Sequence, residues 1–368
     1  MKVSVITRHA ISNYGSLLQT IATQEVISRQ GHVCEIVDYI REDEHYRNID
    51  ETILAKKPEW NNNLIKRNLY LLLRKPASII AGKSFEKNRK TYLNLSRRYT
   101  SLEDLQKDKP VADVYMTGSD QVWGPIGDGK YDSAYLLSYT DVGDRCIAYA
   151  ASFGHTSMEG DTKEFFFREL HRYEQIAVRE DKAVEMLGQL EISAKQVLDP
   201  TLLLDTTYWD SLAARKPREE NYILIYQLHN NPELNEYAKA VAKKTGKKLI
   251  RISASLHQIT RAGKMVFLPS PGEFLGYIKY ADCLITDSFH GTAFAINLNT
   301  NFVEVLPTNG TSSRNVSLLR LLGLTNRLLA DGDLDLVSRK IDYDKVNKRL
   351  EELREESLEH LRRMLRAE

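Results

Sequence analysis

The sequence predicts an α/β protein with two domains, each built on a parallel sheet, followed by a long C-terminal helix. At 368 residues the chain exceeds one ordinary hydrophobic core, so two domains of similar size are expected. In both halves, apolar runs of strand length alternate with helical patterns, which is typical of parallel sheets. We place the domains at residues 1–198 and 199–341, and a helix that packs back on them at residues 342–368.

The first strand–helix–strand unit starts at the N-terminus. Residues 2–7 and 32–39 are apolar runs of strand length, and the segment between them has an apolar helical face. The loop after the first run contains Asn13, Tyr14 and Gly15. It lacks the G-x-G-x-x-G spacing, so we expect no nicotinamide site there.

Residues 41–110 are charged, helical in pattern and poor in strand signals, so we expect a helical insertion in the first domain. Within it, residues 64–83 mix leucines and isoleucines with lysines and arginines. A basic amphipathic stretch of this kind suits an anionic membrane surface. More commonly it is a helix that covers its own domain, and both interpretations stay open.

A second polar turn follows the apolar run at residues 111–116. It contains Ser119, Asp120, Gln121 and Trp123. A carboxylate can bind sugar hydroxyls and an indole can cover the apolar face of a sugar, so this set suits a hydroxyl-rich ligand. Asp120 can also cap a helix, and the two interpretations are compatible.

The later segments repeat the pattern of strands and helices. Strands are expected at residues 145–151, 176–178, 222–227, 248–253, 265–268 and 301–306. Arg179, at the end of one of these runs, could bind a carboxylate or phosphate with two nitrogens, or pair with Glu180 or another acid. Asp199 and Pro200 break the pattern near the expected domain boundary.

Residues 282–297 combine an apolar strand, a tight polar turn and an amphipathic helix. The helix start contains Ser288, Phe289, His290 and Gly291. Ligands of open α/β sheets bind at the carboxyl ends of strands, and a helix N-terminus attracts anions. His290 can titrate near neutral pH, and Gly291 allows close backbone approach. We predict a phosphate or carboxylate site; the alternative is a core histidine bound to a carbonyl.

The composition excludes several classes of protein. A net charge of +1 argues against a general nucleic-acid binder. Cys34, Cys146 and Cys283 lie far apart in apparent strands, so we expect buried thiols without disulfides. No cluster has metal-ligand spacing, so no metal is expected. The chain shows no signal-peptide pattern and no run that spans a bilayer, so we expect a cytoplasmic protein.

Four blocks of the sequence resemble the polysaccharide pyruvyl transferase family. They are N-Y-G-S-L-L-Q at residues 13–19, G-S-D-Q-V-W at 118–123, Y-A-A-S-F-G at 149–154 and S-F-H-G at 288–291. The V-R-E run at 178–180 and the D-P pair at 199–200 fall between them in the order that the family uses. The blocks cover most of the chain, and their joint occurrence is far more specific than any single block.

The resemblance implies a fold and a reaction. The fold is GT-B-like, with two Rossmann-like domains and an active site in the cleft between an N-terminal acceptor domain and a C-terminal donor domain. The reaction moves the carboxyvinyl unit of phosphoenolpyruvate onto two hydroxyls of a sugar in a cell-surface polysaccharide precursor. The products are a cyclic pyruvate ketal and phosphate. Phosphoenolpyruvate is a donor substrate, so no separate cofactor is implied.

The resemblance also assigns residues to the two substrates. The family places phosphoenolpyruvate against the positions of His290 and Arg179, and we add Ser288, Phe289 and Gly291 as neighbours. Some members have an arginine where this chain has Ser288, and Arg314, near an expected helix start, is our candidate for the missing charge. We assign the acceptor to a set of residues from the first two blocks: Asn13, Tyr14, Gly15, Ser119, Asp120, Gln121 and Trp123.

The chemistry needs one general acid, one general base and a site that excludes water. His290 could protonate the methylene carbon or bind the phosphate, and Asp120 could serve as the acceptor-side base or hold a hydroxyl. Because the acceptor could be lipid-linked or nucleotide-linked, we also expect peripheral contact of residues 64–83 with the inner face of the membrane. One alternative is a glycosyltransferase that uses a nucleotide sugar, with Glu304 on the ribose. Another is a scaffold without activity, which Ser288 would favour.

Overall fold

The computed structural model describes residues 1–126, 129–214, 216–307 and 312–366. The chain divides into two compact units. Unit 1 comprises residues 1–153, 158–177 and 254–257, and unit 2 comprises residues 154–157, 178–253 and 258–368.

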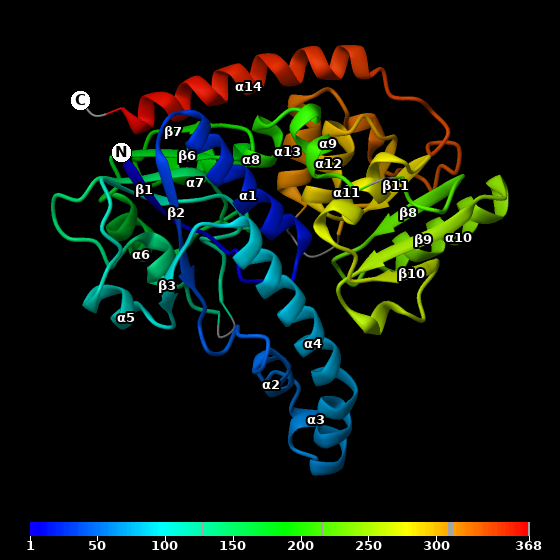
Figure 1. The fold of residues 1–368 in the computed structure, drawn as a ribbon, viewed down its shortest axis with the longest axis horizontal. Helices are drawn as coiled ribbons and strands as arrows, with labels where there is room; N and C mark the ends of the chain where they lie inside the picture. Colours follow the sequence, from blue (N-terminus) through cyan, green and yellow to red (C-terminus); the bar gives the residue numbers. More distant parts are fainter. Residues whose placement is uncertain (127–128, 215, 308–311, 367–368) are drawn as a thin grey trace. The chain divides into compact units, whose positions relative to one another are not determined.

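A seven-stranded sheet organises the first half of the chain (Figure 1). Its strands are β1 (Lys2–Ile6), β2 (Val33–Tyr39), β3 (Leu95–Tyr99), β4 (Val114–Thr117), β5 (Cys146–Ala151), β6 (Gln175–Val178) and β7 (Ala194–Gln196). Their spatial order is β3-β2-β1-β4-β5-β6-β7, and the pairings from β3 to β5 are parallel. This is a doubly wound order that reverses direction between β1 and β4, where such sheets bind ligands.

A five-stranded parallel sheet organises unit 2. Its strands are β8 (Tyr222–Tyr226), β9 (Lys248–Ser253), β10 (Lys264–Phe267), β11 (Cys283–Thr286) and β12 (Phe302–Glu304). The spatial order is β10-β9-β8-β11-β12, and every pairing is parallel. The order therefore reverses between β8 and β11.

Helices connect the strands. They are α1 (Tyr14–Arg29), α2 (Ile49–Ala55), α3 (Pro58–Asn61), α4 (Leu64–Tyr92), α5 (Leu102–Lys107), α6 (Gly160–Leu170), α7 (Asp181–Gly188), α8 (Pro200–Leu203), α9 (Thr206–Leu212), α10 (Pro232–Thr245), α11 (Pro271–Lys279), α12 (Phe289–Asn297), α13 (Ser313–Leu321) and α14 (Tyr343–Leu365). Three 3₁₀ turns are η1 (Ser133–Leu136), η2 (Leu256–Gln258) and η3 (Thr325–Arg327). Several helices begin at a polar side chain that accepts a backbone N–H bond, among them Asn13, Ser288 and Asp342.

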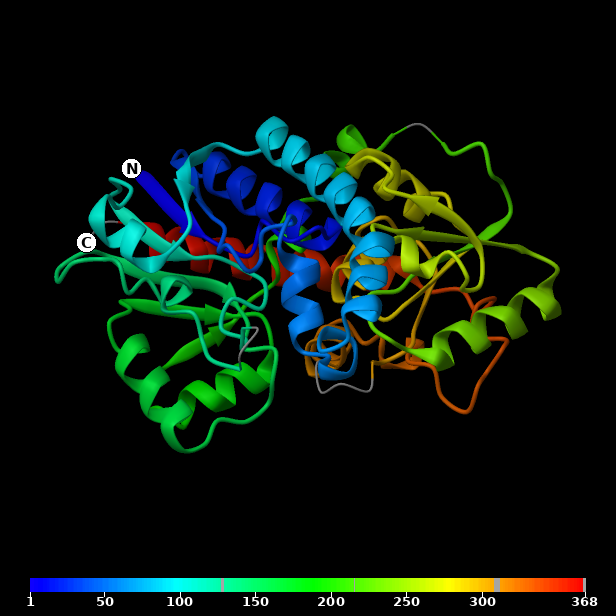
Figure 2. The same cartoon turned by 90° about the horizontal axis from the view of Figure 1, so that it is seen from below.

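Helices cover both faces of each sheet. Figure 2 shows α1 and α6 on opposite sides of the seven-stranded sheet. In unit 2, the apolar side chains of α10 pack with Ile223, Ile285 and Val303 of the sheet. On the other side, aromatic rings of α11 and α12 meet, with Phe274 and Phe294 at 6.1 Å. Both sheets are therefore buried, as their continuous apolar strands require.

The structure confirms the predicted fold class of two Rossmann-like domains and a C-terminal helix. The seven-stranded sheet ends at Gln196, near the boundary expected after residue 198, whereas the division by compactness falls at residues 177 and 178. Within unit 2, α14 packs back on α8, because Arg354 Nε donates to the Leu202 carbonyl at 2.9 Å. Of the expected tail, residues 367 and 368 lie outside the described residues, as does residue 311 of the expected helix cap.

The expectation of a purely helical insertion at residues 41–110 is wrong in part. The segment contains α2, α3, α4 and α5, but it also contributes β3, the edge strand of the first sheet. Two adjacent arginines hid the strand signal. Arg98 Nε bonds to Asp38 of β2 at 2.8 Å, and Arg97 lies over the ring of Tyr99. Charged side chains are common on edge strands, where they discourage pairing with another chain.

Candidate active-site residues

Four buried side chains of unit 2 lie together near the end of strand β6 and the starts of helices α8 and α12. Arg179 follows β6, Asp199 caps α8, and Phe289 and His290 open α12. Their exposed fractions are 3%, 1%, 3% and 6%. Residues that are more than one hundred positions apart in the sequence are thus brought to one point, as expected for Arg179 and His290.

Asp199 is the centre of this cluster. Its Oδ2 atom accepts a hydrogen bond from Arg179 Nη1 at 2.9 Å and lies 3.6 Å from His290 Nε2. Its Oδ1 atom accepts from the backbone N–H and the hydroxyl of Thr201 at 3.0 and 2.7 Å. The guanidinium of Arg179 lies over the ring of Phe289, 4.5 Å from its centroid. His290 Nε2 therefore lies at ion-pair distance from a buried carboxylate, slightly beyond hydrogen-bond range.

The electrostatics of the cluster favour a charged Asp199. Burial opposes its ionisation, but the interactions with His290 and Arg179 and the bond from Thr201 outweigh burial and hold its pKa well below the usual range. A second carboxylate, Glu180, lies 3.7 Å from Arg179 Nε. Arg179 exposes only 1% of its side chain, so in this geometry it fixes Asp199 instead of offering a free cation to a ligand.

The residues around His290 shape the start of α12. Ser288 is its N-cap, and its hydroxyl accepts from the Gly291 N–H at 3.2 Å. A Cβ atom added to Gly291 would lie 2.6 Å from Thr286 Oγ1 and 3.0 Å from the ring of Tyr226. Glycine is therefore required here by helix–strand packing, and the expected approach of an anion stays a prediction.

A second group of polar residues lies where β8 and β11 end. Asp287 accepts bonds from the N–H groups of Leu228 and His229 at 2.7 and 3.2 Å. Burial raises the pKa of Asp287 to about 6, although these bonds oppose the shift. Burial, together with the charge of Arg314, lowers the pKa of His229 to about 4. Arg314 thus lies beside a neutral histidine at the reversal point of the second sheet.

Glu304 is enclosed in the core of unit 2. It is 0% exposed, accepts from Asn315 Nδ2 at 2.7 Å and is bonded to the hydroxyl of Thr292. Burial raises its pKa to about 8 despite these bonds and the charge of Arg314. An enclosed side chain with both oxygens bonded cannot hold a ribose, so the nucleotide-sugar alternative loses the residue on which it depended.

In unit 1, Asp120 lies at the end of β4, next to the reversal point of the first sheet. Its carboxylate accepts from Ser16 Oγ at 2.7 Å and from the Gln121 N–H at 2.8 Å. Its backbone φ is +80°, a left-handed conformation that costs energy in any residue with a side chain. Arg8, a half-buried residue that follows β1, has a raised pKa, because the opposing effect of burial is outweighed by the charges of Tyr135, Glu44 and Asp120. Strain and buried charge at a strand end are typical of binding sites.

The other expected acceptor residues have structural roles in unit 1. Tyr14 and Trp123 are each 1% exposed and pack on Phe85 and Phe153. Their rings have no open face for a sugar, so the expectation that Trp123 covers a sugar is wrong in this structure.

Four expected acceptor residues remain at the same edge of the sheet. Asn13 caps α1 by accepting from the Gly15 N–H at 2.7 Å. The carbonyl of Ser119 accepts from Thr7 Oγ1 at 2.7 Å, and Ser119 itself is buried. Gln121 is half-buried next to Asp120. Asn13 and Gln121 are thus partly exposed at this edge, whereas Gly15, Ser119 and the two rings are buried.

Sequence reasoning missed Asp199, Asp287 and Ser16 as parts of the two clusters. The sequence identifies Asp199 as a break before a proline and as part of the D-P motif, and Ser16 as part of a motif, without a role for either side chain. An acid directly before an N1 proline is a helix-cap signal that could have identified Asp199 as a fixed carboxylate. Its meeting with Arg179 and His290 depends on tertiary structure and has no local signal.

Two features are absent from the described residues, a metal-binding cluster and a membrane-spanning helix. Across residues 1–126, 129–214, 216–307 and 312–366, no group of three His, Cys, Asp or Glu side chains could hold a metal ion. Over the same part of the chain, no helix has the length and apolar character needed to cross a bilayer.

Comparisons with known proteins agree with the sequence motifs. A model of the polysaccharide pyruvyl transferase family matches residues 13–309. No protein with curated function matches the chain in sequence. Among solved structures, a UDP-GlcNAc 2-epimerase from Methanocaldococcus jannaschii is similar, with a TM-score of 0.49, 13% identity and coverage of 99% of both chains. An O-GlcNAc transferase from Thermobaculum terrenum has a TM-score of 0.49 and 10% identity, covering 99% of this chain and 67% of that chain.

These two structural similarities are too weak to carry an argument about activity. The family match is different in kind, because it spans most of the chain and contains Asp120, Arg179, Asp199 and His290. The chain belongs to the polysaccharide pyruvyl transferase family.

Proposed function

We propose that this protein transfers the carboxyvinyl unit of phosphoenolpyruvate to two hydroxyls of one sugar in a cell-surface polysaccharide precursor. The observation that carries the proposal is the His290–Asp199 pair at the start of α12, with Asp199 fixed by Arg179 and Thr201. An imidazole can donate a hydrogen bond to an anion, and the helix N-terminus adds a positive dipole end. Both features suit a small, multiply charged anion.

The reaction starts with a proton transfer. His290, 3.6 Å from Asp199, either donates a proton to the methylene carbon of phosphoenolpyruvate or binds the phosphate. Protonation of the methylene carbon leaves a positive centre at the carbon that bears the phosphate oxygen. One sugar hydroxyl attacks that carbon, forming a C–O bond, and gives its proton to a base.

The second half of the reaction closes the ring. The C–O bond to phosphate breaks and inorganic phosphate leaves with the bonding electrons. The second hydroxyl of the sugar attacks the same carbon, loses its proton, and completes the cyclic ketal. We assign Asp120, bonded to Ser16, to the acceptor hydroxyls as base or anchor. The resemblance implies that Arg179 contacts the donor directly. In this geometry Arg179 instead acts by fixing Asp199.

The test is release of phosphate from phosphoenolpyruvate that requires a sugar acceptor, with the ketal identified by mass spectrometry. His290→Gln is expected to lower turnover by about 10²–10⁴-fold, the range for loss of a general acid. His171, on the surface of unit 1, provides the control, and His171→Gln should keep full activity. Undiminished turnover in His290→Gln would defeat the site assignment.

Ligand binding separates the proposal from the nucleotide-sugar alternative. Phosphoenolpyruvate should raise the melting temperature of the wild type by mass action, and uridine or guanosine diphosphate should not. The opposite pattern would replace the proposed donor with a nucleotide sugar.

A further inference from the structure

Helix α4 exposes a stripe of large apolar side chains, which we call the α4 stripe. It consists of Ile65, Leu69, Leu72, Leu73, Pro76 and Ile80, whose successive spacings of four, three, one, three and four residues keep them on one face of the helix. The exposed fractions of its leucines and isoleucines run from 48% at Leu69 to 80% at Ile65. Monomeric soluble proteins rarely leave so many neighbouring apolar side chains in water without an interaction partner.

The other face of α4 is covered within unit 1. Tyr70 is 8% exposed and lies near Trp60 of α3, with ring centroids 6.1 Å apart. Further along, Gly82 lets Tyr46 approach so closely that a Cβ atom would meet its ring at 2.1 Å. The helix is thus anchored on one side, and the α4 stripe is largely exposed, although Leu73 at its edge lines a hollow with residues 254–257.

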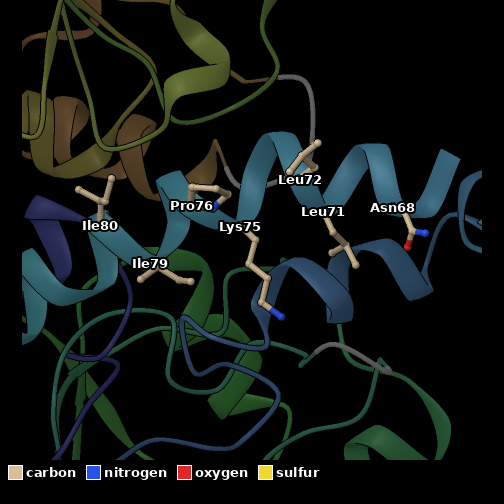
Figure 3. Close-up of a pocket in the computed structure, with 7 residues that line it drawn as sticks. All are labelled: Asn68, Leu71, Leu72, Lys75, Pro76, Ile79 and Ile80. Atoms are coloured by element: carbon tan, nitrogen blue, oxygen red, sulfur yellow. The ribbon is translucent and has the colours of Figure 1, made fainter. Parts of the chain in front are cut away.

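The surface beside the stripe is hollowed. A depression of about 620 Å³ is lined by Asn68, Leu71, Leu72, Lys75, Pro76, Ile79 and Ile80. Figure 3 shows that all of these side chains come from α4 and that Lys75 points away from Leu72. The hollow is therefore a shallow feature of one helix face and not an enclosed ligand cavity.

The charge around the stripe is strongly positive. Residues 49–83 contain seven lysines and arginines and three acids, although the whole chain is nearly balanced with 51 basic and 50 acidic residues. Two of the acids are in ion pairs, Asp50 with Arg74 at 3.5 Å and Glu51 with Lys75 at 2.7 Å. Lys66 and Lys83 have no ion pair within the part of the chain that the structure describes, and both are exposed.

We propose that the α4 stripe docks unit 1 on an anionic lipid bilayer. An apolar helix face flanked by lysines matches the boundary between acyl chains and anionic headgroups. A second copy of the chain fits less well, because pairing two stripes would also oppose two basic surfaces. The inference does not depend on the proposed reaction, and a bilayer surface is where a lipid-linked acceptor would be found.

Sedimentation of the full-length protein with lipid vesicles tests this. The protein should sediment with vesicles of phosphatidylcholine and phosphatidylglycerol, and far less with phosphatidylcholine alone. Ile65→Gln with Leu72→Gln should lower the partition coefficient more than tenfold by removing apolar contact. Lys66→Gln with Lys83→Gln should lower it by about fivefold for each charge removed, with a weaker salt dependence.

Two control variants carry the same changes elsewhere in unit 1. Val142→Gln replaces an exposed apolar residue and Lys107→Gln an exposed lysine, both outside α4. Neither should alter partitioning, and all variants should keep the wild-type melting temperature because the positions are exposed. Equal partitioning of the wild type and the stripe variants would overturn the proposal. So would a dimer, seen by sedimentation velocity without lipid, that Leu72→Gln dissociates.

Discussion

The two strand-end turns of this protein are alike in position and different in construction. Each follows the strand at which its sheet reverses direction, β4 with Asp120 and β11 with His290. The first turn stores strain in its backbone at Asp120, with a φ of +80°, and the adjacent strand β5, which bridges to Asp120 through Ala151, has a φ of +56° at Ala150. The second has a regular capped helix start and instead concentrates buried charge in Arg179, Asp199 and His290.

The difference indicates which kind of ligand each turn would bind. A strained backbone places one carboxylate rigidly, which suits the selection of particular hydroxyls on a neutral sugar. A buried cluster of charged groups beside a helix N-terminus suits a charged donor. Substitutions in the charged turn should therefore act on donor binding and stability, and those in the strained turn on the acceptor.

The largest effect is expected for Asp199→Asn. It leaves Arg179 buried beside a neutral amide and removes the partner of His290, so the free energy of unfolding should fall by about 3–5 kcal/mol. Turnover should also fall by at least about 10²-fold, because His290 loses its orienting partner. Chemical denaturation and phosphate release measure the two effects.

The exposed ion pair between Lys244 and Asp335 is the matched control, at 2.7 Å. Asp335→Asn should change the free energy of unfolding by less than about 1 kcal/mol, as exposed pairs do. Equal losses of unfolding free energy in Asp199→Asn and Asp335→Asn would show that Asp199 does not stabilise the buried charges around it.

The charged turn also shows where sequence reasoning succeeds and fails. The strand, turn and helix at residues 282–297 could be predicted, because each has a local pattern. The pairing of His290 with Asp199 could not, because it joins segments 91 positions apart through the packing of α12 on α8. The prediction for Trp123 failed although its motif is local. A polar motif does not indicate whether the ring of an aromatic residue within it is buried or exposed.

Glu304, the buried acid in the core of unit 2, should make the stability of the protein depend on pH. Burial raises the pKa of Glu304 from 4.5 to about 8, so the folded state holds a proton that the unfolded state releases. The stability that this proton contributes is present below pH 4.5 and is lost as the pH rises towards 8. The loss for this one group is on the order of 3–5 kcal/mol.

Glu304→Gln should remove that dependence. A glutamine amide can replace the protonated acid, donating to Thr292 and accepting from Asn315. Denaturation measured from pH 5 to pH 8 should show a smaller fall in stability for the variant than for the wild type. Parallel curves for the two proteins would show that Glu304 is ionised across the whole range.

Asp120→Asn tests the strained turn. Asparagine tolerates a positive φ about as well as aspartate, so the backbone should keep its conformation and the melting temperature should change little. Turnover should fall by about 10²-fold if the carboxylate acts as a base. The stabilisation by phosphoenolpyruvate should persist, in contrast to His290→Gln. Loss of donor binding in Asp120→Asn would erase the distinction between the two turns.

The smallest effect is expected for Ala150→Gly. Ala150 has a φ of +56° inside β5, where glycine avoids a cost of about 1–2 kcal/mol but loses more entropy on folding. The free energy of unfolding should therefore rise by no more than about 1 kcal/mol, measured by chemical denaturation. Ala148, buried in the same strand without a positive φ, provides the comparison, and Ala148→Gly should destabilise. A loss of stability in both variants would show that packing at Ala150 matters more than its backbone strain. The first turn would then owe its strain to Asp120 alone.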